Sequence, residues 1–204
     1  MNWRLNKIQY PVYNLGPGKR VGIWVQGCDL GCNGCLNQTL WGTRGGRRID
    51  VLEIFNWLIS LDGEFDGITV SGGEPFQQYE ALIAFLHLVK TRTRHDVYCF
   101  SGYYLDELNK LFPDKLFCRY IDLLVDGRYV AELHEDSNLK GSSNQTIYKF
   151  INGTPHIVEE PSPIQWSLKV SEDNRIYMAG IPKQRDLEKI CSELALVGIK
   201  KEFR

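Results

Sequence analysis

The sequence lacks the features of secreted, membrane-bound and nucleic-acid-binding proteins. Its first residues, MNWRLNKIQYPVYNL, contain no uninterrupted apolar segment like that of a signal peptide. No later apolar run reaches the roughly 20 residues that span a bilayer. The net charge of -1 gives the chain no overall positive field for nonspecific phosphate binding. We therefore expect a cytoplasmic protein that binds neither a membrane nor nucleic acid.

The sequence also lacks a disulfide framework, internal repeats and low-complexity segments. With 204 residues, 43% of them hydrophobic, the chain is long and apolar enough to bury a core without disulfide bonds. Cys99, Cys118 and Cys191 occur singly among apolar neighbours, which predicts small buried side chains. These properties are typical of a single globular domain.

The remaining cysteines, Cys28, Cys32 and Cys35, belong to the segment QGCDLGCNGCLNQTLW (26–41) and span only eight residues of it. Thiolates are the ligands that iron-sulfur clusters require, and spacings of four and three residues let one loop bind one compact cluster. A 4Fe-4S cluster normally takes four cysteines, so a local set of three leaves one iron without a protein ligand. The segment therefore predicts a cluster with one open coordination position.

A zinc site is the alternative interpretation of the same cysteines. A closed structural zinc site needs four ligands, and neither cysteine nor histidine occurs between Cys35 and His87. A distant fourth ligand would make the protein a non-catalytic zinc- or iron-sulfur-binding adaptor. Elemental analysis showing one zinc and no inorganic sulfide would support that hypothesis.

Short apolar runs alternate with amphipathic segments through the first 125 residues. The runs predict strands and the amphipathic segments predict helices, the first helix being capped by Asp50 with Glu53 three residues later. The predicted strands are 21–25, 67–70, 97–100 and 121–125, and the predicted helices are 51–61, 79–91 and a short one ending by Pro113. This order favours a parallel α/β sheet with right-handed crossovers. We expect residues 1–150 to form a partial (β/α) TIM-like barrel of about six strands, open on one side.

The alternation weakens after residue 131. TIYKFI (146–151) is strand-like, and PHIVEEPSP (155–163) is predicted to be a linker. IQWSLKV and RIYM flank the turn residues SEDN and predict a β-hairpin. Pro182 begins a predicted helix. We expect residues 151–204 to be an extension packed on the core rather than an independent domain.

Polar segments follow the ends of four successive predicted strands. They are residues 28–35, 71–74 and 101–103, and Asp126. Because the carboxyl ends of parallel strands meet at one edge of a sheet or barrel, we expect these segments to converge. Two of them also fit local structure, since Ser101 could cap a helix and Asp126-Gly127 could form a hairpin turn.

The spacing CxxxCxxC, followed by VSGGEPFQQ (70–78), resembles the radical SAM superfamily. The resemblance is closer to its glycyl-radical-enzyme activases, and within them to anaerobic ribonucleotide reductase activating proteins. The segments that carry it are WVQGCDLGCNGCLNQTLW (24–41), FSGYYLDEL (100–108), DLLVDGRYV (122–130) and LKGSSNQ (139–145).

The resemblance implies that Cys28, Cys32 and Cys35 bind a 4Fe-4S cluster whose open iron chelates S-adenosylmethionine (SAM). An electron from a flavodoxin-like or ferredoxin-like donor would cleave SAM to methionine and a 5'-deoxyadenosyl radical. That radical would abstract the Cα hydrogen of a glycine in a partner, the anaerobic ribonucleotide reductase. A different glycyl radical enzyme, a peptide or a small molecule is the alternative target.

The expected SAM-binding residues belong to the resembling motifs and the strand ends. They are Gly34, Leu36, Ser71, Gly72, Gly73, Glu74, Ser101 and Asp126. Gly34 stands where many superfamily members carry an aromatic residue near adenine, so Leu36 or a backbone contact would take that role. The loop GSSNQ (141–145) could line the SAM pocket or be a surface turn.

Overall fold

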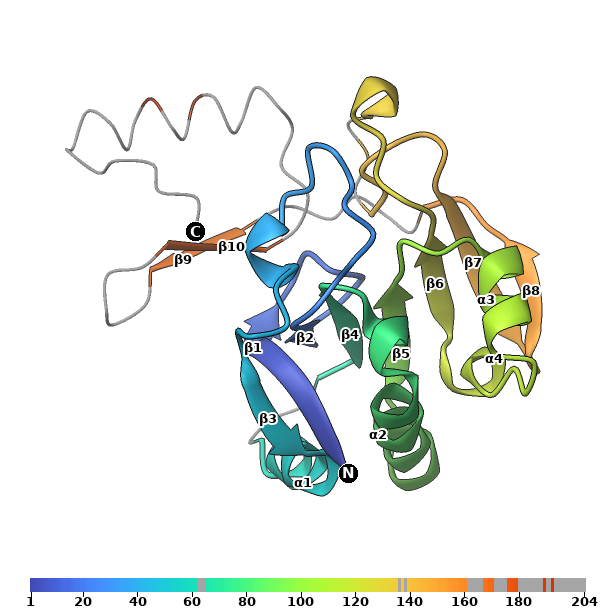
Figure 1. Ribbon diagram of the computed structural model, residues 1–204. Coiled ribbons are helices and arrows are strands. Elements are labelled where there is room, and N and C mark those ends of the chain that lie inside the picture. Colours follow the sequence, from blue (N-terminus) through green and yellow to red (C-terminus); the bar gives the residue numbers. More distant parts are fainter. Residues whose placement is uncertain are drawn as a thin grey trace.

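The computed structural model describes residues 1–61, 65–135, 137, 139–160, 167–170, 176–179, 189 and 192. Its main element is an eight-stranded sheet with the order β3-β1-β2-β4-β5-β6-β7-β8 (Figure 1). The strands are β1 (Asn2–Val12), β2 (Arg20–Val25), β3 (Arg47–Asp50), β4 (Gly67–Gly72), β5 (Asp96–Phe100), β6 (Leu123–Asp126), β7 (Thr146–Ile151) and β8 (Thr154–Ile157).

The centre of the sheet is parallel and its flanks are antiparallel. Strands β2, β4, β5 and β6 run parallel to one another. The antiparallel strands β1 and β3 extend one side, and β7 and β8 extend the other. The four strands predicted from apolar runs are thus the four parallel ones, while the partial barrel remains a prediction.

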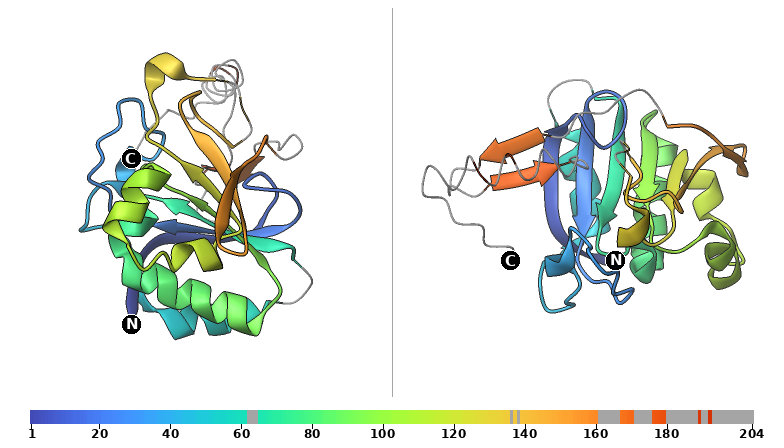
Figure 2. Two further views of the ribbon diagram at one scale, coloured as in Figure 1. Left: turned by 90° about the vertical axis from the view of Figure 1, so that its right-hand side faces the viewer. Right: turned by 90° about the horizontal axis from the view of Figure 1, so that it is seen from above.

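The helices cover one face of this sheet, as Figure 2 shows. They are α1 (Val51–Ile59), α2 (Tyr79–Arg92), α3 (Leu105–Leu111) and α4 (Phe117–Tyr120). Three short 3-10 helices lie in the connections: η1 (Gln38–Leu40), η2 (Pro75–Gln78) and η3 (Ala131–Leu133). Asp50 caps α1 as predicted, because its carboxylate accepts a hydrogen bond from the Leu52 amide at 2.9 Å. Both long predicted helices are confirmed within one or two residues at each end.

The central strands are buried on both faces, which explains their continuous apolar sequences. Ile23 of β2 and Val70 of β4 pack with the helices in the main core. Their neighbours Trp24 and Thr69 are buried on the opposite face, where Trp24 packs in a smaller cluster. Cys99 and Cys118 are buried, as predicted.

Three strands differ from the sequence-based expectation. We expected residues 155–163 to be a linker, but residues 155–157 belong to β8, so the sheet continues past the predicted boundary at residue 150. This strand is exposed throughout and contains Pro155, which edge strands tolerate and which hides the usual strand pattern. The expectation also omitted β1 and β3, and an irregular register between Leu5 and Lys7 interrupts the alternation of β1.

The predicted hairpin is confirmed by β9 (Ser167–Val170) and β10 (Ile176–Ala179), which pair antiparallel. Apart from Lys189 and Ser192, the predicted helix from Pro182 lies outside the described residues, as does Cys191. The packing of the extension on the core remains a prediction. Within the described ranges, no helix combines the length and apolar character needed to cross a membrane.

Candidate functional site

One cavity, with a volume of about 160 Å³, brings the three loop cysteines together with residues at and just beyond the carboxyl ends of β4 and β5. Its lining residues are Cys28, Leu30, Cys32, Cys35, Trp41, Ser71, Gly72, Gly73, Glu74, Phe100, Ser101, Gly102, Gly127 and Gln145. The predicted convergence at the carboxyl ends of the parallel strands therefore holds for the first three polar segments.

The cysteine loop, residues 27–42, is closed at its base by backbone hydrogen bonds. The amide of Gly27 donates to the Leu40 carbonyl at 2.8 Å, and that of Cys28 donates to the Trp41 carbonyl at 3.1 Å. The buried side chain of Gln26 donates to the Gly42 carbonyl at 2.7 Å. These bonds close residues 27–42 into a loop, and all three cysteines of the loop line the cavity.

The three thiols are free and partly buried. Burial raises the pKa of Cys28 to about 11 and also raises the pKa of Cys32. Because iron binds the thiolate, a bound cluster supplies the positive charge that offsets this burial. In the part of the chain that is described, no three Cys, His, Asp or Glu side chains form a group that would hold a single metal ion. A cluster has no such requirement, since each cysteine binds a different iron.

Gly72 and Gly73 join the end of β4 to the start of the cysteine loop. The amide of Gly73 donates to the Val25 carbonyl at 2.9 Å, and the amide of Glu74 donates to the Gly27 carbonyl at 2.8 Å. A Cβ atom on Gly73 would lie 2.2 Å from the Gly27 carbonyl oxygen. Gly72 has φ +113, and a Cβ there would lie 2.4 Å from the Val25 nitrogen. Both positions therefore require glycine.

The carboxylate of Glu74 is buried, with 1% of the residue exposed. One oxygen accepts hydrogen bonds from the Phe76 amide at 2.9 Å and the Ser101 hydroxyl at 3.0 Å. The other oxygen accepts a bond from the Gly102 amide at 2.7 Å. Burial raises the pKa of Glu74 to about 7, although these three donors favour the ionised form.

Glu74 has no ion pair with a basic side chain anywhere in the described ranges. A buried carboxylate in that situation is costly, and a cationic ligand would lower the cost. The amino group of SAM is such a ligand. The cavity residues thus fit both groups, since three thiols suit the cluster and Glu74 suits the charge of SAM.

Three residues predicted to bind SAM are not among the cavity residues. Gly34 has φ +75, and a Cβ there would lie 3.1 Å from the ring of Tyr129. Leu36 is 56% exposed. The aromatic side chain that packs at Gly34 thus comes from a distant segment, which explains why position 34 itself is small. The SAM contacts of Gly34 and Leu36 remain predictions.

Asp126 is the third such residue, and its carboxylate is engaged by backbone amides. It accepts hydrogen bonds from the amides of Leu105 at 2.7 Å and Thr146 at 3.2 Å. Burial raises the pKa of Asp126. Asp126 thereby connects the start of α3 with the start of β7, and its contact with SAM remains a prediction. Asp126-Gly127 does not form a two-residue hairpin turn, because β6 pairs with β7, which starts at Thr146.

Six residues line the cavity although the sequence did not predict them individually: Leu30, Trp41, Phe100, Gly102, Gly127 and Gln145. The Gln145 side chain donates to the Gly127 carbonyl at 2.7 Å and accepts from the Gly141 amide at 2.7 Å. It thus fixes the backbone that follows β6 in position beside the cavity. The loop GSSNQ was the available signal, and its last residue is the one that lines the pocket.

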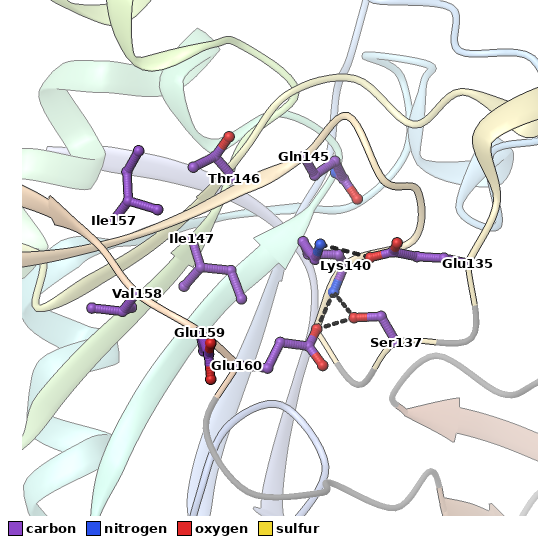
Figure 3. Close-up of a pocket in the computed structure, with 10 residues that line it drawn as sticks. All are labelled: Glu135, Ser137, Lys140, Gln145, Thr146, Ile147, Ile157, Val158, Glu159 and Glu160. Carbon is purple, nitrogen blue, oxygen red and sulfur yellow. Dashed lines mark hydrogen bonds and ion pairs between the residues drawn. The ribbon is translucent and has the colours of Figure 1, made fainter.

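A second, larger cavity of about 530 Å³ lies between β7, β8 and the residues Glu135, Ser137 and Lys140 (Figure 3). Gln145 lines both cavities. In the larger one, the Glu160 carboxylate accepts a hydrogen bond from the Leu139 amide at 2.9 Å, and Lys140 forms an ion pair with Glu135 at 2.6 Å. Its lining contains no cysteine. We therefore assign the redox chemistry to the smaller cavity.

Comparison with known proteins identifies the family. Residues 14–148 match the model of the 4Fe-4S single cluster domain. The anaerobic ribonucleoside-triphosphate reductase-activating protein of Haemophilus influenzae is 36% identical over 155 residues, which cover 72% of this chain and 99% of the relative. That of Escherichia coli K12 is 32% identical over 68% of this chain and 94% of the relative. The bacteriophage T4 protein of the same name is 29% identical over 68% and 88%.

The chain belongs to this family of activating proteins. It is a radical SAM enzyme, and its cofactors are a 4Fe-4S cluster and SAM. The matched range contains the cysteine loop, the segment 71–74 and Ser101, which are the parts that surround the smaller cavity.

Proposed function

We propose that this activating protein generates a glycyl radical on an anaerobic ribonucleoside-triphosphate reductase. When bound, the reduced cluster supplies the electron that cleaves SAM into methionine and a 5'-deoxyadenosyl radical, which takes the Cα hydrogen of the partner's glycine. The curated relatives are named for activation of this reductase. The observation that carries the proposal is that three cysteines from one loop share a cavity with a buried carboxylate that forms no ion pair within the described residues.

The chain's own residues would bind and orient the reactants. Cys28, Cys32 and Cys35 would each hold one iron and leave the fourth for SAM. Glu74, held by Ser101 and the Gly102 amide, would position the methionine ammonium through charge and hydrogen bonding. Gly72 and Gly73, which pack against the backbone of Val25 and Gly27, would hold Glu74 next to the cysteine loop.

The electron donor and the cellular location are further parts of the proposal. We propose that a flavodoxin-like or ferredoxin-like protein supplies the electron and that the enzyme works in the cytoplasm. Five free cysteines among the described residues support a reducing compartment.

Anaerobic reconstitution tests this function. Protein loaded with iron and sulfide and treated with dithionite and SAM should release 5'-deoxyadenosine. Addition of the purified reductase should then produce a glycine-centred EPR doublet. The matched controls are Cys32→Ala protein and a reductase in which alanine replaces the radical-bearing glycine.

The possible failures have different meanings. An intact cluster that yields no 5'-deoxyadenosine would contradict the proposed SAM chemistry. Release of 5'-deoxyadenosine without a glycyl radical on the reductase would favour another glycyl radical enzyme, a peptide or a small molecule as the target. One zinc per chain without sulfide would favour the adaptor.

A further inference from the structure

The first 49 residues carry a charge excess that the rest of the chain reverses. They contain seven Lys or Arg and one acidic residue, whereas residues 50–204 contain 17 and 24, respectively. Three of the seven cations serve the fold: Arg20 is buried and pairs with Asp96, and the amines of Lys7 and Lys19 lie over aromatic rings. The other four lie on β1, on β3 and in the segment that precedes β3.

These four cations place positive charge at one edge of the sheet. Arg44, Arg47 and Arg48 are exposed, and Arg4 faces Arg48 in the β1–β3 ladder. We name Arg4, Arg44, Arg47 and Arg48 the basic edge. Where the structure describes the chain, no acidic side chain forms an ion pair with any of these four.

The pairing of Arg4 with Arg48 is unfavourable for the isolated protein. Directly opposed residues on neighbouring strands project from the same face of the sheet, and like charges there repel. Among the residues that the structure describes, no carboxylate forms an ion pair with either arginine, so ion pairing there does not offset this repulsion. An acidic partner that approached this edge would relieve it.

The basic edge adjoins the cysteine loop. A Cβ on Gly27 would lie 3.7 Å from the Thr43 side chain, and Arg44 is the next residue. The Trp41 carbonyl accepts a hydrogen bond from the Cys28 amide, and Trp41 lines the cavity. The Arg4 guanidinium donates to the Gly45 carbonyl at 3.3 Å. The segment that carries the cations therefore packs against the residues that lead into the cysteine loop.

We propose that the basic edge is the docking surface for an acidic protein that carries single electrons. This inference rests on the proposed function, because each SAM cleaved requires one electron. In the transfer, the reduced flavin or iron-sulfur centre of the donor loses one electron and the enzyme's cluster gains it, with no proton transferred. A positive surface beside the acceptor steers an acidic protein toward it and shortens the path of the electron.

The test compares two reductants on the reconstituted enzyme. The triple variant Arg44→Glu, Arg47→Glu, Arg48→Glu should be reduced by a photoreduced acidic flavodoxin about 10- to 100-fold more slowly than the wild type at low salt, the range expected for loss of steering. Reduction by the 5-deazariboflavin radical, which is uncharged and which light generates with EDTA as the electron source, should be unchanged. Bleaching of the cluster absorbance reports both rates without SAM cleavage, so failure of the proposed function does not obscure the result.

Two further variants serve as controls. Arg92→Glu, Arg94→Glu reverses two exposed charges near the end of α2, beyond the amino ends of the strands, and should leave both rates unchanged. Arg48→Glu alone places opposite charges across the β1–β3 ladder and should not lower the unfolding temperature. An unchanged flavodoxin rate in the triple variant, or an equal loss in the α2 variant, would overturn the proposal. So would a triple variant that keeps its flavodoxin rate and loses binding to the reductase.

Discussion

The two walls of the site cavity are built in different ways. The cysteine loop is closed at its base by backbone bonds and by Gln26, and its three thiols are partly buried. The other wall, which we name the strand-end wall, consists of residues 71–74 and 101–102. It is held together by the carboxylate of Glu74 and its three hydrogen bonds. The chain alone organises the strand-end wall, whereas the cysteine loop needs its cluster to balance the burial of its thiolates. Substitutions in the two walls should therefore separate cofactor loading from protein stability.

The largest expected effect is on the cysteine wall. Cys28→Ala removes one of three ligands and should abolish the cluster. It should change the free energy of unfolding of the apoprotein by less than about 1 kcal/mol. Iron and sulfide analysis and urea denaturation measure the two quantities. The matched control is Cys118→Ala, a buried cysteine outside the cavity, which should keep the cluster and lose about 1 kcal/mol of stability. Full cluster content in the Cys28 variant would show that the loop is not the ligand set.

Glu74 of the strand-end wall should make the free energy of unfolding depend on pH. The pKa of Glu74 is raised from 4.5 to about 7, so the folded apoprotein binds more protons than the unfolded chain between these values. Its stability should therefore fall as pH rises through that window, by about 3 kcal/mol in total. Urea denaturation of wild type and Glu74→Gln at each pH isolates the effect. A constant difference between the two proteins from pH 4.5 to 7.5 would contradict the buried-carboxylate interpretation.

The joint between the two walls is the next most sensitive point. Gly73→Ala forces a methyl group against the Gly27 carbonyl and should cost about 1 to 3 kcal/mol. Because that carbonyl precedes Cys28, cluster content should fall as well. Gly42→Ala is the control, since nothing lies within 4 Å of a Cβ at that position. Equal stability of the two variants, measured by thermal unfolding, would mean that the walls are not rigidly joined.

Ser101→Ala should have the smallest effect. It removes one of the three donors to Glu74 and should cost about 1 kcal/mol at pH 8, where the carboxylate is ionised. The cost should shrink at pH 5, because the protonated carboxyl needs fewer donors. Ser143→Ala, at an exposed position of the GSSNQ loop, should stay within about 0.5 kcal/mol of wild type at both pH values. A pH-independent cost would place the role of Ser101 elsewhere.

The sequence predicts the centre of the molecule better than its edges. Buried parallel strands have continuous apolar runs, which the sequence shows directly. Their carboxyl ends lie at one edge of the sheet, and this brings residues 28–35, 71–74 and 101–103 together whatever the conformation of the connecting loops. The edge strands β3 and β8 are short and mostly exposed, so they have no such pattern. Asp126 shows what the sequence does not predict for a single residue. Its position at a strand end is predictable, but the hydrogen bonds that it accepts from the Leu105 and Thr146 amides depend on tertiary packing.

Mössbauer spectroscopy of enzyme reconstituted with 57Fe tests the central claim most directly. Because three thiolates would leave one iron open, SAM should change the Mössbauer parameters of one iron in four and leave those of the other three unaltered. A spectrum in which SAM alters no iron, although the cluster is intact, would contradict the account.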